Sequence, residues 1–474
     1  MPQIHSDSKL EHPLSPPEAK VGKGKAKRRS RRAPKDPTAG LAVLNPNAAA
    51  IDIGATEHWV AVPPGRDKES VRRFGCFTAD LQALVAWLKK GRVDTVVLEA
   101  TGNYWVVLYD LLEAKGFNPV VVNPRYAKNM TGKKGDLSDS QWMQKLHTYG
   151  LFANSFRPGE AIRQLRTYLR QRETLVSAAS QAIQHMHKVL VEMNVQLARV
   201  VSDISGETGL RIIDAILGGE RDPQALARLK DPRIRASCKE IALALQGHWK
   251  EEQLFVLEQA RLSFDHYQEQ IEQCNQRIEQ QMSSLQSRYP QDPPLKTEPC
   301  APAGQPVRAF NLGAELKRIA GVDLTRIDGI GAVTAQIVLS EVGPDVSKWA
   351  TEKRFASWLG LCPDHRISGG KILSRSTRRV VNRARNALRL AAYSLERSQS
   401  ALGAKYRRLK SKLGAPKAII AMAHHLARLI WRMLRYGTEY VDKGMAVYEA
   451  KYRAQRLKWL IKQAQELNMK LVAA

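Results

Sequence analysis

The feature that most constrains the fold is a short apolar segment with one carboxylate in its middle, AAAIDIG at 48–54. Turn-forming residues at 45–47 precede it and a glycine ends it, a pattern that predicts a β-strand. An unpaired charge inside a buried strand is unfavourable. Asp52 is therefore either a strand-end residue beside a turn or a ligand of a cation such as Mg²⁺. For a lone aspartate the first alternative is the simpler one.

Residues 47–158 predict an α/β domain. Strands at about 48–54, 57–63 and 70–77 are joined by short turns, so we expect them to be antiparallel neighbours. Further elements follow in alternation. They are a helix at 81–90, a strand at 95–99, a helix at about 104–115, a strand at 119–122 and a helix beginning near Asp139. The order βββαβαβα is that of a ribonuclease-H-like fold.

Four carboxylates fall at the ends of these elements. Asp52 lies in the first strand, Glu99 ends the fourth, and Asp136 and Asp139 flank the start of the last helix at i, i+3 spacing. Four converging carboxylates would repel one another, and two divalent cations would stabilise them and assist phosphoryl transfer. Separately, they are two strand-end residues and a helix-capping pair. All four in this order favour a metal site.

The charge balance indicates a polyanionic partner. The 474 residues include 74 Lys and Arg against 46 Asp and Glu, a net charge of +28, and the excess is spread along the chain. Residues 1–46 are a basic, proline-rich tail that cannot bury a core. The tail is either an arm that binds nucleic acid through counterion release or a solvated extension.

Other features exclude several classes of protein. We find no apolar run long enough for a transmembrane helix and no signal peptide. The five cysteines are scattered, without a zinc motif or a disulfide framework. We therefore expect a protein of a reducing cytoplasm.

The middle of the chain predicts long helices. Residues 161–200 and 246–287 are free of proline, and the second segment carries apolar residues at heptad-like spacing. This predicts a coiled-coil hairpin or dimerisation stalk; a helical linker with no oligomeric role is the alternative. Residues 288–320 are rich in proline and predict a linker.

Two features mark the C-terminal part. Gly329-Ile330-Gly331, between a short helix and an amphipathic one, resembles a helix-hairpin-helix, in which backbone N–H groups approach phosphates. Simple helix packing is the alternative. Ser368 precedes two glycines in a loop that contains Arg366, Lys371, Arg375 and Arg378. Cations can activate a serine and stabilise a phosphoryl group. The residues alone favour a phosphate-binding turn over a nucleophile.

Two sets of motifs resemble the DEDD-type transposases of the insertion-sequence 110 family. The first set is IDIG at 51–54, LEATG at 98–102, VNP at 122–124 and KGDLSD at 134–139. The resemblance implies a RuvC-like domain whose Asp52, Glu99, Asp136 and Asp139 bind Mg²⁺. The second set is Gly-Ile-Gly, WLGLCP at 358–363 and SGGK at 368–371. It implies a C-terminal domain in which Ser368 attacks DNA and forms a phosphoserine link, with Ser374 and Ser376 as less favoured alternatives.

We therefore expect a multi-domain α/β and all-α protein. Its parts are a disordered basic tail (1–46), a RuvC-like domain (47–158), a helical coiled-coil region (159–287), a linker (288–320), a transposase domain with a helix-hairpin-helix (321–447) and a basic helix (448–474). The resemblance implies a DNA transposase of the bacterial cytoplasm, associated with the nucleoid, guided by a non-coding RNA and acting on element ends and target. A metal-dependent junction nuclease and a non-catalytic nucleic-acid-binding protein are the alternatives. The heptad-like apolar stripe, rather than the resemblance, indicates a homo-oligomer, a dimer or tetramer.

Overall fold

The computed structural model describes residues 38, 40–123, 138–288, 310–374, 376–378, 380–470 and 472. The chain divides into two compact units, Met1–Arg157 and Pro158–Ala474. Asp136, Arg375, most of the basic tail and residues 289–309 of the proline-rich stretch lie outside the described residues, as does the side chain of Arg366.

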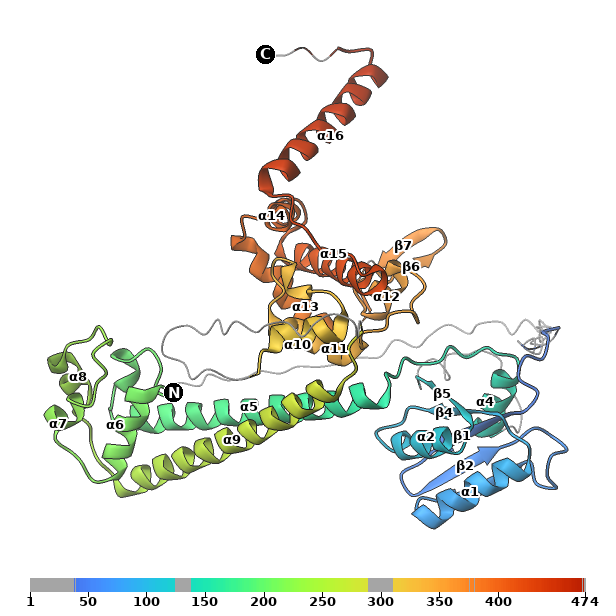
Figure 1. Cartoon of the computed structure of the whole chain (residues 1–474), viewed down its shortest axis with the longest axis horizontal. Helices are drawn as coiled ribbons and strands as arrows, with labels where there is room; N and C mark the ends of the chain where they lie inside the picture. The colour runs from blue at the N-terminus through green and yellow to red at the C-terminus, as the bar shows by residue number, and fades with distance from the viewer. Residues whose placement is uncertain are drawn as a thin grey trace, which may run out of the picture. The chain divides into compact units, whose positions relative to one another are not determined.

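The first unit is built on a mixed five-stranded sheet with the order β3-β2-β1-β4-β5 (Figure 1). β1 pairs antiparallel with β2 and parallel with β4. The strands are β1 Ala48–Ile53, β2 Glu57–Ala61, β3 Val71–Gly75, β4 Thr95–Glu99 and β5 Asn118–Val122. The described part of the unit also contains the helices α1 Thr78–Lys90, α2 Trp105–Ala114 and α4 Asp139–Thr148. This confirms the predicted α/β sheet, with three antiparallel strands followed by parallel ones.

The sheet is covered on both faces because apolar residues alternate along β1 and β4. Ala49 and Ile51 of β1 and Leu98 of β4 belong to the core shared with α1 and α2. Ala50 and Val97 belong to a second core, which contains Trp142, Met143 and Leu146 of α4. The side-chain period of two in a strand thus assigns α4 to one face of the sheet and α1 and α2 to the other.

In the second unit, α5 (Glu160–Glu192) and α9 (Glu251–Ser284) lie side by side (Figure 1). The heptad-spaced residues Leu257, Phe264, Ile271 and Ile278 of α9 are all buried. The apolar stripe on α9 thus has its partner helix in the same chain, so the stripe alone does not require a second subunit. The elements between these two helices are η1 Leu197–Arg199, α6 Glu207–Leu217, α7 Pro223–Ala227 and α8 Cys238–Ala244.

In the described residues that follow α9, the elements of the second unit are helices and one β-hairpin. The first of these helices, α10 (Leu312–Ala320), lies within the stretch that the sequence indicated as a linker. Then come η2 Leu324–Arg326, α11 Ala332–Val342, α12 Glu352–Trp358, β6 Arg366–Ser368, β7 Lys371–Ser374, α13 Arg383–Ser394, η3 Leu395–Arg397, α14 Ala401–Leu413, α15 Ala415–Tyr436 and α16 Met445–Glu466. The apolar stripe of α15 is buried, whereas no residue of α16 is. No helix within the described ranges combines the length and apolar character needed to span a bilayer.

Candidate active site

Asp52 and Glu99 are neighbours at one end of the sheet. β1 and β4 run parallel with Ile51 opposite Leu98, so the next residue of each strand is Asp52 and Glu99 respectively. Parallel neighbours lie about 4.8 Å apart, and paired residues point to the same face. That face is the one covered by α4, because it carries Ala50 and Val97 two residues earlier. Asp52 is half-buried and Glu99 is 8% exposed.

Asp139 is the first residue of α4. Ser138 is the N-cap: its Oγ accepts a hydrogen bond from the Gln141 N–H, and its own N–H donates to Gln141 Oε1. The N-cap is therefore Ser138 and not Asp139, which the sequence had offered as a possible capping residue. Helical spacing places Asp139 on the same side of α4 as Trp142 and Met143, which pack on the sheet.

Polar contacts at the far end of α4 define its direction. Gln144 Nε2 donates to the carbonyl of Ala48 at 3.0 Å, and His147 Nε2 lies 2.9 Å from Thr95 Oγ1. Because the Thr95 hydroxyl donates to the Asn118 carbonyl, His147 is the donor to Thr95. The C-terminal half of α4 therefore lies over the starts of β1 and β4. Its N-terminal end, with Asp139, faces toward the ends of the strands that carry the two carboxylates.

His147 and Gln144 are positioning residues that sequence reasoning missed. Burial lowers the pKa of His147 to about 4, so the ring is neutral at pH 7. Both residues occupy inward positions next to Met143 and Leu146, and a polar side chain at such positions was the signal available in the sequence.

The described residues supply only part of a metal site. Within them, no group of three or more His, Cys, Asp or Glu side chains lies close enough to hold an ion. The strand register brings Asp52 and Glu99 together, and α4 places Asp139 at the same end of the same face. Asp136 belongs to a stretch outside the described residues. The donors are carboxylate oxygens, which suit a hard cation such as Mg²⁺.

Ser368 lies at the tip of a β-hairpin. β6 and β7 pair with Ser368 opposite Lys371, and the two glycines between them have φ of +53° and +75°. These values allow a tight two-residue turn, which only glycine adopts readily at both positions. Ser368 and Lys371 are both exposed. The predicted loop is thus a hairpin that presents the serine and one cation side by side.

Arginines brace the segment that follows the hairpin. Arg378 Nη2 donates to the backbone carbonyl of Ser357 at 2.7 Å, so its guanidinium lies against α12. Arg385 of α13 donates to the Arg378 carbonyl and to Thr377 Oγ1, each at 3.1 Å. Burial and, to a lesser degree, the charge of Arg389 lower the pKa of Arg385. These contacts hold the segment around Thr377 and Arg378, called the basic segment below, against α12 and α13. Of the less favoured serines, Ser374 and Ser376 have their hydroxyls 3.0 Å apart.

The two glycines of the predicted helix-hairpin-helix have different roles. Gly329 has φ +84°, and a Cβ there would lie 2.7 Å from the carbonyl oxygen of Ala391. Packing against α13 therefore requires this glycine. Gly331 is the N-cap of α11; no side chain caps the helix, and a Cβ at Gly331 would meet open space. Of the two, Gly331 is the position where a phosphate could approach backbone N–H groups.

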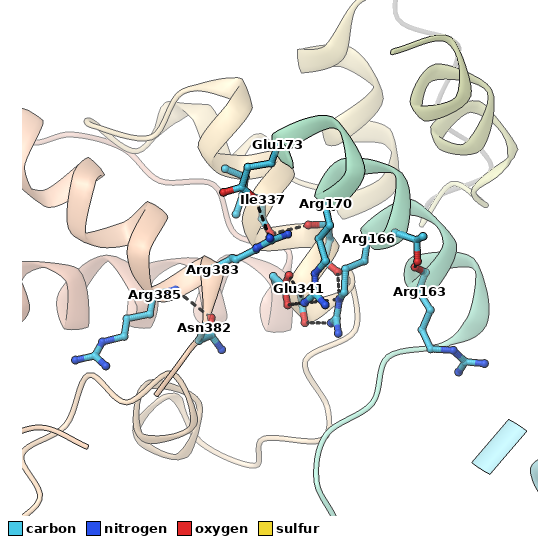
Figure 2. A network of polar contacts seen from close by, with 11 residues as sticks. Arg163, Arg166, Arg170, Glu173, Ile337, Glu341, Asn382, Arg383 and Arg385 are labelled. Carbon is cyan, nitrogen blue, oxygen red and sulfur yellow. Dashed lines mark hydrogen bonds and ion pairs between the residues drawn. The ribbon is translucent and has the colours of Figure 1, made fainter. Parts of the chain in front are cut away.

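A buried carboxylate that sequence reasoning did not find connects α5 to α11. Glu341 is 6% exposed, and Arg170 Nη2 lies 2.9 Å from its Oε1. Arg166 donates to the backbone carbonyls of Ser340 and Glu341, and its Nε lies 3.4 Å from Glu341 Oε2. Figure 2 shows both arginines directed at Glu341.

A second ion pair connects α5 to α13. Arg383, the first residue of α13, lies 3.2 Å from Glu173 of α5 (Figure 2). Arg383 follows the basic segment directly along the chain. The Glu341 contacts orient α11, whose N-cap is Gly331, and the Arg383–Glu173 pair orients α13.

Comparisons with known proteins agree with the motifs. A family model with the description "Transposase", for the DEDD transposases of the IS110 type, matches residues 49–195. A second, "Transposase IS116/IS110/IS902 family", matches residues 322–407. The chain is also 32% identical over 125 residues to "Putative transposase y4pF/y4sB" of Sinorhizobium fredii (strain NBRC 101917 / NGR234). That alignment covers 25% of this chain and 32% of the relative, so the chain spans about a third of that protein's length.

The fold and the matched segments define the class that the chain resembles: transposases with a DEDD-type N-terminal segment and a second conserved segment in the C-terminal part. Both matched segments are similar to the insertion-sequence 110 family of transposases, the family that the motifs resemble. The resemblance predicted from the motifs is confirmed.

Proposed function

We propose that this protein is the transposase of an insertion sequence, which cleaves and exchanges DNA strands with a serine nucleophile and a Mg²⁺-binding DEDD site. The observation that carries the proposal is the register of β1 and β4, which makes Asp52 and Glu99 neighbours in the segment matched by the DEDD family model. The two family matches support DNA as the substrate and a divalent metal as the cofactor.

Asp52, Glu99, Asp136 and Asp139 are the proposed metal ligands. Glu99 is nearly buried beside a second carboxylate, an arrangement that a cation stabilises. When bound, Mg²⁺ supplies charge stabilisation at the phosphate oxygens. The chain's own contribution is to hold the ligands: the sheet aligns Asp52 with Glu99, while the contacts of Gln144 and His147 hold α4 over the same face.

Ser368 is the proposed nucleophile. Its Oγ attacks a DNA phosphate, forming a serine–phosphorus ester while one strand end leaves as a hydroxyl that takes up the proton. The hydroxyl of another strand end then attacks this ester, restores a phosphodiester and releases Ser368, so no further reactant is needed. Lys371, opposite Ser368 in the hairpin, is placed to favour the alkoxide and to bind the phosphate.

Nucleic-acid contacts would come from the basic C-terminal part. The N-terminus of α11 at Gly331, with Gly329 shaping the turn before it, would bind a backbone phosphate. Arg366, Lys371, Arg375 and Arg378 would bind neighbouring ones or support the segment that does. Phosphate contacts position a protein without reading sequence. Sequence choice would come from a non-coding guide RNA of the element, through base pairing.

Ser368 and the DEDD residues belong to different units of the chain. We propose that a homo-oligomer, a dimer or tetramer associating through the coiled-coil region around α5 and α9, combines the two centres within one chain or across subunits.

The test is strand exchange by the full-length protein with the element's end DNA, its target, its flanking RNA and Mg²⁺. We expect Asp52→Asn and Glu99→Gln to abolish exchange while DNA binding persists. Glu69→Gln, an exposed carboxylate variant in the same unit, should retain exchange. Wild-type protein that binds the DNA but exchanges no strands, with Asp52→Asn and Glu99→Gln binding as wild type does, would favour a non-catalytic binding protein. DNA cleavage that survives in Ser368→Ala would favour a metal-dependent junction nuclease.

A further inference from the structure

The hairpin that carries Ser368 also carries an exposed apolar pair. Ile367 of β6 lies opposite Ile372 of β7, next to the pair formed by Ser368 and Lys371. Because side chains alternate along a strand, the two isoleucines share one face and the serine and lysine share the other. Ile367 is 62% exposed, Ile372 44% and the neighbouring Leu373 70%.

An exposed apolar pair of this kind contributes little to the stability of the hairpin, because its side chains stay in contact with water. A two-stranded hairpin is marginally stable by itself, and its apolar face normally packs on a core. In Figure 1 the β6–β7 hairpin extends away from the helices around it. Scattered apolar residues on a surface are ordinary, but here two paired isoleucines lie directly beside the proposed nucleophile.

Charge identifies the partner that would cover this face. Residues 364–389 contain eight Lys and Arg against one Asp. The eight are Arg366, Lys371, Arg375, Arg378, Arg379, Arg383, Arg385 and Arg389. A segment of this sign in the sequence attracts a polyanion, and duplex DNA offers both phosphates for cations and stacked bases for the apolar pair.

We propose that Ile367 and Ile372 insert between adjacent base pairs of bound duplex DNA and unstack them, while Ser368 and Lys371 lie on the opposite face of the same hairpin. Apolar side chains that enter a base step in this way kink the duplex, at a cost that the additional protein–DNA contacts offset.

This inference rests on the proposed function, because it takes DNA as the ligand. It goes beyond that function by assigning positioning residues, which open the base step rather than react. They make no bond to the phosphate, so their effect is visible without any chemistry.

The test uses the full-length protein and a DNA duplex with 2-aminopurine at regular positions along one strand, since this base brightens when it is unstacked. We expect wild type and Ser368→Ala to raise the fluorescence on binding, and the double variant Ile367→Ser/Ile372→Ser to lose that rise while still binding the duplex. The matched control is Leu243→Ser, which replaces an exposed leucine on α8 (67% exposed) and should keep the rise.

The outcomes separate the inference from the function on which it rests. If wild type binds the duplex without a rise, or the double variant retains the full rise, the inference is wrong while the proposed function stands. If a single-stranded RNA probe carrying 2-aminopurine brightens and the duplex does not, the partner of this face is RNA and the inference is again overturned. If wild type does not bind DNA, the proposed function itself fails.

Discussion

Protonation of His147 should loosen α4 and so disturb the acidic end of the sheet. Burial lowers the pKa of His147 from its ordinary value of 6.5 to about 4. At a pH above the pKa of His147 in the unfolded chain, the ring is neutral in both the folded and the unfolded state, and the protein has its full stability. As the pH falls from the unfolded value toward the folded one, the unfolded state takes up a proton that the folded state resists, and stability is lost.

The size of the effect follows from those two values. A difference of about 2.5 pKa units corresponds to about 3.4 kcal/mol once both values have been passed. Between about pH 7 and pH 5, roughly 2 kcal/mol of this is lost, which lowers the protection of the α4 amides about twentyfold.

Hydrogen exchange of α4 over this pH range, corrected for the intrinsic exchange rate, measures the loss. His147→Gln removes the titrating group and should flatten the dependence; His185→Gln, an exposed histidine on α5, should not. If wild type and His147→Gln show the same pH dependence in α4, the argument from the burial of His147 is refuted.

Other substitutions test the second unit. Glu341→Gln removes the charge between two arginines, one of them half-exposed, and should lower the free energy of unfolding, measured by urea denaturation, by about 2 kcal/mol. Glu207→Gln, in an exposed ion pair, should change the free energy of unfolding by less than about 0.5 kcal/mol. Equal effects would show that burial of Glu341 does not matter. Gly329→Ala should cost about 2 kcal/mol because of its positive φ and the Ala391 carbonyl. Gly331→Ala should cost less than about 1 kcal/mol but weaken DNA binding; unchanged binding would remove α11 from the interface.

The sequence was most informative where local signals agree with the tertiary structure. Apolar runs bounded by turn residues located all five strands of the sheet, and β4 has the predicted bounds. The helix α10 was missed because the prolines before it dominated the composition. Its own signals, Asn311 as N-cap and Gly321 in the left-handed region as C-cap, were present.

The contacts that position the site could not be predicted, since they join residues far apart in the chain. Glu341 and Arg166 are separated by 175 positions, and nothing local marks them as partners. The sequence could not decide whether the apolar stripe of α9 packs on a helix of the same chain or on another subunit. The packing of α5 on α9 shows that it packs within the chain. The convergence of all four DEDD carboxylates and the role of Ser368 stay predictions, because Asp136 is outside the described residues and the serine's reaction is chemistry rather than fold.

The covalent intermediate is the most direct test of the central claim. The full-length protein is incubated with its element-end DNA, RNA and Mg²⁺, denatured and digested, and the peptide that retains a nucleotide is sequenced by mass spectrometry. We predict a single adduct on Ser368, absent in Ser368→Ala and present in Ser374→Ala. An adduct that persists in Ser368→Ala, or strand exchange that proceeds without any adduct, would contradict the account.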